Sequence, residues 1–256
     1  MPLEQRRWFA PPSAPLGSLH MKIMPTLHKV SLAICNVLLF ATVSTPVSAA
    51  SLSVTPVIIE GAGGQNAHVV TLHNAGEKPI HAQVRIMSWR QSNGDDILEE
   101  TRRVIASPPI AEVAPGGDFT IRVVRMANEP LADEESYRLL IDEIPDAALR
   151  RNGLVALAIR FSVPAFFSPA DAGLPRVTWS IGRSGSRPLL VASNMGDKRL
   201  KVSDLYYGGK SVAKGLAGYI LGRSEKTWPL PPGAKGAGGV TAMTDRGPLA
   251  GTANAK

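Results

Sequence analysis

The side chains that could carry acid–base or metal chemistry are few and scattered in this sequence. Three histidines, His68, His73 and His81, follow the first 50 residues, and the 256-residue chain has one cysteine, Cys35, inside an apolar run near its start. A structural or catalytic zinc ion needs three or four ligands of this kind in one shell. We therefore expect no metal site, and a disulfide framework is excluded.

A phosphate-binding loop is the second chemistry that the sequence suggests but does not support. Gly209, Lys210 and Ser211 match the end of such a loop, but its first glycine would fall at Asp204. The flanking residues have the pattern of strands, whereas the loop requires a strand followed by a helix. We expect no phosphate-binding site here and no cofactor.

Carboxylates gather at two places, where a pair of acids could act in general acid–base catalysis. Both clusters fall in predicted turns, so we expect solvated loop charge rather than catalysis. The clusters are Asp133, Glu134 and Glu135, and Asp95, Asp96, Glu99 and Glu100. The sequence thus predicts no catalytic residue, and we expect that the protein is not an enzyme.

One apolar segment has a pattern suited to binding another protein. Residues 154–167 alternate, which predicts a strand with one apolar face made of Val155, Leu157, Ile159, Phe161 and Val163. The other face carries Arg160 and Pro164, and proline is tolerated in a strand at a sheet edge. A long apolar edge strand is an aggregation hazard unless a partner strand pairs with it. Two interpretations remain open: a partner-binding strand, or five core residues of a sandwich.

The elements that would position this segment are all predicted to be strands. Apolar residues alternate with polar ones between turns rich in glycine, proline and asparagine. Strands are expected over 52–59, 68–73, 80–89, 103–107, 119–124, 137–144, 154–167, 176–181, 188–193, 200–207, 211–221 and 240–244. One helical turn is expected at 133–136 and a frayed end at 251–256. The fold class is therefore all-β, and the strand spacing predicts a β-sandwich.

The charge distribution divides the chain into two units. Residues 51–169 carry a net charge of −4, whereas residues 170–256 carry +8, within a total of +7. We expect a first β domain over 51–169 and a smaller β domain over 170–256 with a Gly/Ala-rich tail. The basic second unit is expected to be a solvated face, and nucleic acid is not an expected partner because the chain is predicted to be exported.

The N-terminal segment has the pattern of a secretory signal peptide at 21–50. Met21 begins a short basic stretch, about a dozen apolar residues follow from Leu32, and small residues end the segment near Ala50. The apolar run is too short to span a membrane as a helix. Residues 1–20 fit no part of this pattern, and we interpret them as a start-site artefact. The mature chain is expected to begin near Ser51, without a membrane span.

With these strands in place, the chain resembles the periplasmic pilus-assembly chaperones, the PapD-like family of two immunoglobulin-like domains. Within that family it looks closest to the branch found with spore-coat-U-type pilins. Five stretches in the first domain and three in the second carry the resemblance: 51–56, 72–79, 107–116, 133–145 and 152–169, then 202–205, 218–221 and 228–232.

The resemblance implies a function in the periplasm. A pilin-type subunit is a sandwich that lacks its final strand, and the chaperone lends its own strand to the open groove, which is donor-strand complementation. The partners implied are pilin or coat-type subunits and an outer-membrane usher. The apolar face from Val155 to Val163 corresponds to the inserted residues. The alternative is that this protein is itself a secreted structural or adhesive subunit of a surface fibre.

The sequence departs from the family at the basic pair that grips the subunit's terminal carboxylate. The family's arginine aligns with Ile58 and its lysine with Pro164, so neither basic residue is present. Arg160 has the same strand parity as the missing lysine and could bind a carboxylate with two parallel hydrogen bonds. We expect Arg160 to be either this anchor or an exposed solubilising arginine.

Overall fold

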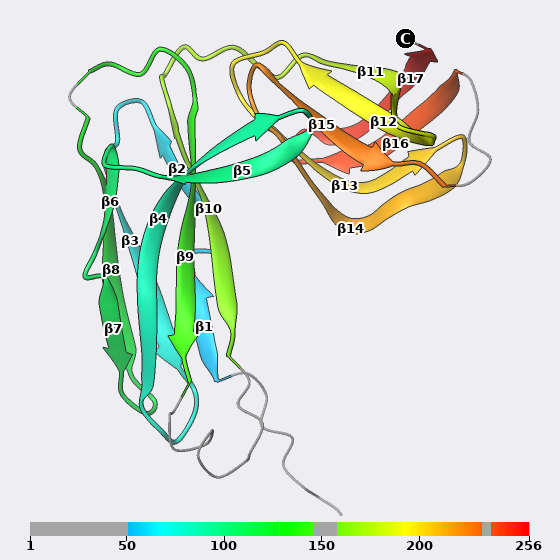
Figure 1. Cartoon of the computed structure of the whole chain (residues 1–256). Coiled ribbons are helices and arrows are strands. Elements are labelled where there is room, and N and C mark those ends of the chain that lie inside the picture. Colours follow the sequence, from blue (N-terminus) through cyan, green and yellow to red (C-terminus); the bar gives the residue numbers. More distant parts are fainter. Residues whose placement is uncertain (1–50, 128, 146–157, 232–236, 256) are drawn as a thin grey trace, which may run out of the picture. The chain divides into compact units, whose positions relative to one another are not determined.

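The computed structural model describes residues 51–127, 129–145, 158–231 and 237–255. Seventeen strands and no helix are found in these ranges (Figure 1). Accordingly, none of the described elements is a long apolar helix of the kind that crosses a membrane. The described part is thus all-β, as predicted. The proposed signal peptide at 21–50 lies outside the described residues.

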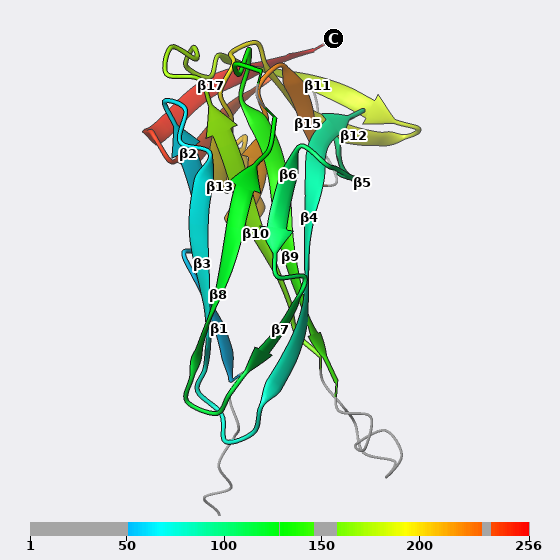
Figure 2. The same cartoon turned by 90° about the vertical axis from the view of Figure 1, so that its left-hand side faces the viewer.

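The first sandwich consists of two sheets. One has the order β1-β3-β8-β6, and its strands are β1 (Leu52–Thr55), β3 (Ala67–Asn74), β8 (Asp118–Arg125) and β6 (Val104–Ser107). The other has the order β2-β10-β9-β4-β5, with β7 also paired to β4. Its strands are β2 (Ile59–Ala62), β10 (Arg160–Ser168), β9 (Glu135–Ile144), β4 (Ile80–Ser92), β5 (Asp95–Glu100) and β7 (Ile110–Val113). Figure 2 shows the two layers from the side.

The chain passes from one sheet to the other within its first described residues. β1 pairs antiparallel with β3, and after an interruption at Pro56 the chain returns as β2, which pairs parallel with β10. Proline has no N–H to donate to a ladder, so Pro56 is suited to the break between the two strands. The sequence predicted one continuous strand over 52–59, and this was wrong because the two halves belong to different sheets.

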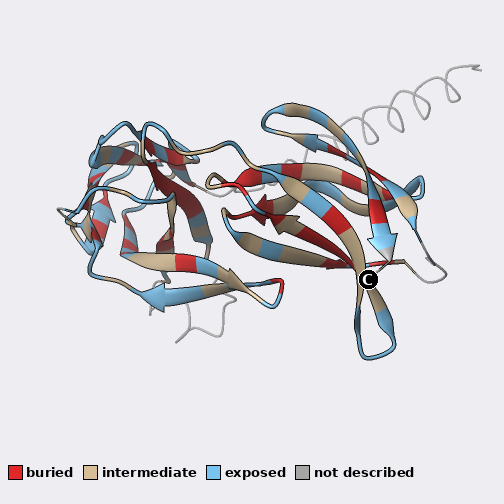
Figure 3. Ribbon diagram, turned by 90° about the horizontal axis from the view of Figure 1, so that it is seen from above, coloured by how far each residue is buried: buried red, intermediate tan, exposed pale blue. Residues whose placement is uncertain are grey.

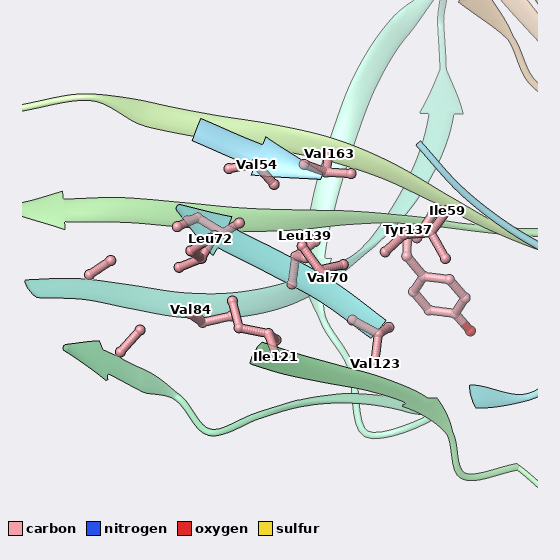
Figure 4. Close-up of a cluster of buried hydrophobic side chains, with 14 of the residues drawn as sticks. Val54, Ile59, Val70, Leu72, Val84, Ile121, Val123, Tyr137, Leu139 and Val163 are labelled. Carbon is pink, nitrogen blue, oxygen red and sulfur yellow. The ribbon is translucent and has the colours of Figure 1, made fainter. Parts of the chain in front are cut away.

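The core of the first sandwich is made of the inward-facing residues of both sheets. In β4, for example, Ile80, Ala82 and Val84 are buried while the residues between them are exposed. Figure 4 shows the cluster, in which Val54 of β1 and Val163 of β10 point into the same core. Burying each large apolar side chain contributes about 1.5–3 kcal/mol, which drives the two sheets together.

The second β unit is one seven-stranded sheet around its own core. The strand order is β14-β13-β16-β17-β11-β12-β15. The strands are β11 (Val177–Ser184), β12 (Arg187–Asn194), β13 (Leu200–Tyr207), β14 (Lys210–Ile220), β15 (Ser224–Pro229), β16 (Gly238–Thr244) and β17 (Gly247–Ala255). The two edge strands are joined by a side chain, since the Trp228 indole N–H donates to the Ala217 carbonyl at 3.0 Å. Figure 3 colours the strands by burial, and in β16 the buried Val240 and Ala242 alternate with exposed residues.

A buried asparagine organises the same turn in both β units. Asn74 ends β3 and Asn194 ends β12, each followed by Gly, an acid and Lys at the same spacing. The amide of Asn74 donates to the Lys78 carbonyl, and that of Asn194 to the Lys198 carbonyl. In each turn the asparagine oxygen accepts from the glycine N–H two residues later. This side-chain-to-backbone bonding is characteristic of Asn in turns.

Several sequence expectations are corrected. β5, β7 and β15 were not predicted, and the end expected to be frayed is most of β17. The helical turn expected at 133–136 is absent, because Glu135 and Ser136 begin β9. β5 and β15 are rich in polar residues and β17 in small ones. Their strand pattern is therefore weak, and pairing with neighbours decides their conformation.

Candidate functional site

The first sandwich has a strand edge that is only half covered. β10 pairs along its length with β9, but on its other side β2 pairs only with residues 165–168. Among the described residues, no strand pairs with 160–164 on that side (Figure 1). We call this half of β10, which lacks a second partner strand in the described part of the chain, the open edge.

The ladder register shows which backbone groups face outward from the open edge. The Glu143 N–H donates to the Ile159 carbonyl at 2.9 Å, so residue 159 directs its carbonyl toward β9. Because antiparallel ladders alternate, the backbone groups of Arg160, Ser162 and Pro164 point away from β9. The N–H that proline lacks would have pointed outward, so Pro164 leaves the β9 ladder intact. This explains how a proline is accommodated in β10.

The five apolar residues that the sequence offered as a partner-binding face do not all have the same surroundings in the structure. The side chain of Val163 is 3% exposed and lies in the core, and Phe161 packs against the same cluster. Ile159 is half-buried, just before β10. Val155 and Leu157 lie outside the described residues. The side chains of Phe161 and Val163 therefore belong to the protein's own core, as one of the two interpretations expected. The backbone beside them forms the open edge.

On the opposite face, two arginines share one carboxylate beside the open edge. Asp142 of β9 binds Arg85 of β4 at 2.6 Å through one oxygen and Arg160 of β10 through the other. Burial opposes ionisation of Asp142, but these two guanidinium groups lower its pKa. The side chains of Arg160 and Arg85 remain 61% and 42% exposed, so the group carries a surplus positive charge at the surface. Arg160 is thus exposed but already paired.

Sequence analysis missed a second cation on this face, Arg138 of β9. Its guanidinium lies 3.8 Å from the centroid of the Trp89 ring and 5.6 Å from that of Tyr219. Among the described residues no carboxylate lies within ion-pair distance of it, and burial lowers its pKa. Arg138 is the register partner of Pro164. The sequence feature that could have indicated this residue is an arginine inside the otherwise apolar run 137–141. Only the register of β9 with β10 shows that it lies beside Pro164.

The two positions aligned with the family's basic pair carry uncharged side chains. Pro164 is buried on the face that carries Arg138. Ile58 packs against an aromatic cluster of Trp89, Phe166 and Tyr219, together with Leu221. Neither side chain can form an ion pair with a carboxylate. A cation on this side of the sheet therefore comes from another position, and Arg138 of β9 is the register partner of Pro164.

The carboxylates expected to be solvated are in large part engaged in ion pairs, which corrects that prediction. The side chain of Glu134 is fully buried, binds the Arg199 guanidinium at 2.7 Å and accepts from the Ser168 hydroxyl at 2.6 Å. Glu135 binds Arg125 at 2.9 Å. The two partners of Glu134 lie 34 and 65 residues away in sequence, so local composition could not reveal these contacts.

The second carboxylate cluster also differs from its expected place in a turn. Asp95, Asp96, Glu99 and Glu100 all lie in β5. Asp96 accepts hydrogen bonds from Trp89 at 3.1 Å, Gln91 at 2.8 Å and Lys226 at 2.7 Å. Glu99 forms an exposed pair with Arg90. Asp96 therefore links β5 to β4 and β15. In the described residues no group of three potential ligands could hold a metal ion.

Comparison with known proteins agrees with this geometry. Residues 50–173 match the family model of the pili and flagellar-assembly chaperone, PapD N-terminal domain. No curated protein matches the sequence. The match spans the first sandwich, including the open edge of β10.

Solved structures show the same fold over both β units. A chain in the CsuC–CsuE chaperone–tip adhesion subunit pre-assembly complex of Acinetobacter baumannii is 23% identical, with a TM-score of 0.68, and the match covers 81% of this chain and 100% of that chain. The E. coli chaperone DraB is 22% identical, with a TM-score of 0.55 and coverages of 80% and 93%. A chain in the Salmonella enterica SafA pilin–SafB chaperone complex is 18% identical, with a TM-score of 0.59 and coverages of 78% and 95%. The first sandwich therefore belongs to the family of the pili and flagellar-assembly chaperone, PapD N-terminal domain, and the two β units together have the fold of pilus chaperones of solved structure.

Proposed function

We propose that this protein is a periplasmic chaperone that caps pilin-type subunits by donor-strand complementation and passes them to an outer-membrane usher. The observation that carries the proposal is the open edge of β10, where residues 160–164 have no partner strand among the described residues. An edge of this kind is a ready template for a strand of another chain. The narrower likeness to the spore-coat-U branch stays a prediction.

The open edge provides backbone hydrogen bonds for such a partner. Arg160 and Ser162 each present an N–H and a carbonyl, and Pro164 presents a carbonyl. Each bond formed contributes about 0.5–1.5 kcal/mol net. The apolar residues before β10, Val155, Leu157 and Ile159, are proposed to fill the subunit's groove, which adds about 1.5–3 kcal/mol for each fully buried side chain.

A subunit's terminal carboxylate would find its cation on β9. Arg138 is half-buried, has no carboxylate partner among the described residues and lies beside Pro164, where the family has its lysine. The Nε of Arg160, in contrast, is already bound to Asp142. We propose Arg138 as the residue that binds the terminal carboxylate. Arg160, the candidate from the sequence, is the alternative.

The test of the chaperone proposal is co-expression of the exported protein with secreted β-proteins encoded near it. Recovery of a one-to-one complex supports the proposal. The matched variants are Ser162→Pro, which removes an outward N–H, and Ser162→Ala, which keeps it. We expect Ser162→Pro to lose most of the complex and Ser162→Ala to keep it. Failure to retain any client, or polymerisation of the protein alone, would favour the alternative of a fibre subunit.

The same complex separates the two candidate anchors. Arg138→Gln should weaken subunit binding by about tenfold or more, since a hydrogen bond to a charged group contributes about 1.5–3 kcal/mol. Arg160→Gln should have the smaller effect. A subunit with an amidated C-terminus should bind wild type and Arg138→Gln equally. If Arg160→Gln has the larger effect and the C-terminal amide abolishes that difference, Arg160 is the anchor.

A further inference from the structure

The surplus positive charge beside the open edge has a consequence for the partner strand. Arg85, Asp142 and Arg160 lie on three neighbouring strands, β4, β9 and β10, on the outer face of the sheet. Two guanidinium groups share one carboxylate, and each takes a different oxygen of it. The charges therefore alternate across the sheet and end on a positive group at the open edge.

Arg160 has donors left for a further acceptor. Only its Nε is bound to Asp142, and the described residues provide no other partner for the side chain. Its side chain is 61% exposed, so an added strand can approach it without displacing the protein's own residues. Both oxygens of Asp142 are in use, so Asp142 cannot neutralise Arg160 fully while Arg85 is bound.

A strand that pairs with the open edge places one side chain next to Arg160 on the same face. Directly opposed residues on paired strands have Cβ atoms about 4.5–5.5 Å apart, and opposite charges there are stabilising. A lysine or arginine at that position would face two arginines and one aspartate, which is repulsive. An aspartate or glutamate would continue the alternation of charge and occupy the free donors of the guanidinium.

We infer that the subunit strand that pairs with β10 carries an aspartate or glutamate beside Arg160, so that this row of charges selects the subunit and its register. This inference rests on the proposed pairing of a subunit with the open edge. It concerns a side-chain carboxylate within the paired strand and is separate from the terminal carboxylate assigned to Arg138.

The test uses short peptides that are acetylated and amidated, so that no terminal charge takes part. Valine alternates with threonine, and a single glutamate is moved along the threonine face, with glutamine at the same positions as the neutral control. Binding to the full chain is measured by fluorescence anisotropy at low and high salt. We expect one favoured glutamate position, with binding about 2- to 5-fold tighter than for glutamine and a smaller preference at high salt.

Substitutions of the three charged residues should change the preference for glutamate over glutamine peptides in defined directions. Arg160→Gln should abolish the preference for glutamate, and Arg85→Gln should weaken it, because Asp142 is then free to neutralise Arg160. Asp142→Asn should strengthen the preference. Arg122→Gln, on the exposed face of the other sheet, is the matched control and should leave it unchanged.

Equal binding of glutamate and glutamine peptides by the wild type would overturn the inference, and so would binding of no peptide at all. Neither result bears on chaperoning itself, because the peptides contain no subunit groove and co-expression tests that function separately. A complex recovered by co-expression whose subunit has a basic residue beside Arg160 would also overturn the inference, while leaving the proposed function standing.

Discussion

The repeated asparagine turn allows one perturbation to be made twice in the same chain. Asn74→Ala removes three hydrogen bonds: the amide donates to the carbonyls of Lys78 and Val113, and the side-chain oxygen accepts from the Gly76 N–H. Asn74 is fully buried. At about 1 kcal/mol for each bond lost, we expect a loss of about 3 kcal/mol in the free energy of unfolding.

Asn194→Ala removes more bonds and should be the more damaging change. Its amide donates to the carbonyls of Lys198, Ile220 and Leu221, and its oxygen accepts from the N–H groups of Gly196 and Arg176. An NH2 group has two hydrogens for these three carbonyls, so one hydrogen is shared, and the set is equivalent to about four bonds, which predict a loss of about 4 kcal/mol. Asn194 is also buried, so its backbone partners would be left away from water.

Urea unfolding followed by hydrogen exchange and mass spectrometry measures both losses and places each in its own β unit. Asn66→Ala is the control, because Asn66 is exposed, and it should change the free energy of unfolding by about 0.5 kcal/mol or less. If Asn194→Ala costs no more than Asn66→Ala, or less than Asn74→Ala, then counting buried hydrogen bonds does not explain why these turns hold.

Two further predictions concern charge and backbone conformation. Burial alone would raise the pKa of Glu135, but its hydrogen bonds to Arg125, Tyr137 and Arg103 lower that pKa. The ionised Glu135 therefore stabilises the fold above the unfolded pKa of about 4.3, and this stabilisation is lost as pH falls through the lower folded pKa. In urea unfolding at a series of acidic pH values, Glu135→Gln should reduce the pH dependence of the free energy of unfolding more than Glu99→Gln does. Gly94 has φ +84° and an added Cβ would run into Thr227, whereas Gly64 has φ +89° and open space. We expect Gly64→Ala to cost about 1–2 kcal/mol in thermal unfolding and Gly94→Ala to cost roughly 1–3 kcal/mol more, and equal costs would contradict the contact.

The alternation of apolar and polar residues in β10 predicted which side chains share a face, but not what covers each face. Alternation correctly separated Phe161 and Val163 from Arg160 and Pro164, because side-chain direction in a strand follows the sequence with a period of two. Pro164 correctly indicated a strand edge. Alternation could not show that Val163 is buried in the core of the first sandwich. An apolar face has the same sequence pattern whether the protein's own second sheet or a partner protein covers it.

The charged residues show the opposite case. Glu134 and Arg199 pair although they lie 65 residues apart in sequence, and local composition indicated solvated loop charge at the carboxylates. Burial of an ion is tolerated only when an opposite charge lies against it, and that requires knowing which strands are neighbours. Sheet order and register supplied this information.

The sequence by itself determined the all-β class, most strands, the turn between the strands at 68–73 and 80–89, and a likeness to a chaperone family. These depend on local alternation, turn chemistry and motifs that are written in consecutive residues. Only the tertiary structure decided that the edge at 160–164 is open, that Arg138 lacks a carboxylate partner among the described residues, and that Arg160 shares Asp142 with Arg85. The physical reason is that edges and ion pairs are properties of neighbouring strands, and neighbours in a sheet are set by packing of the whole chain.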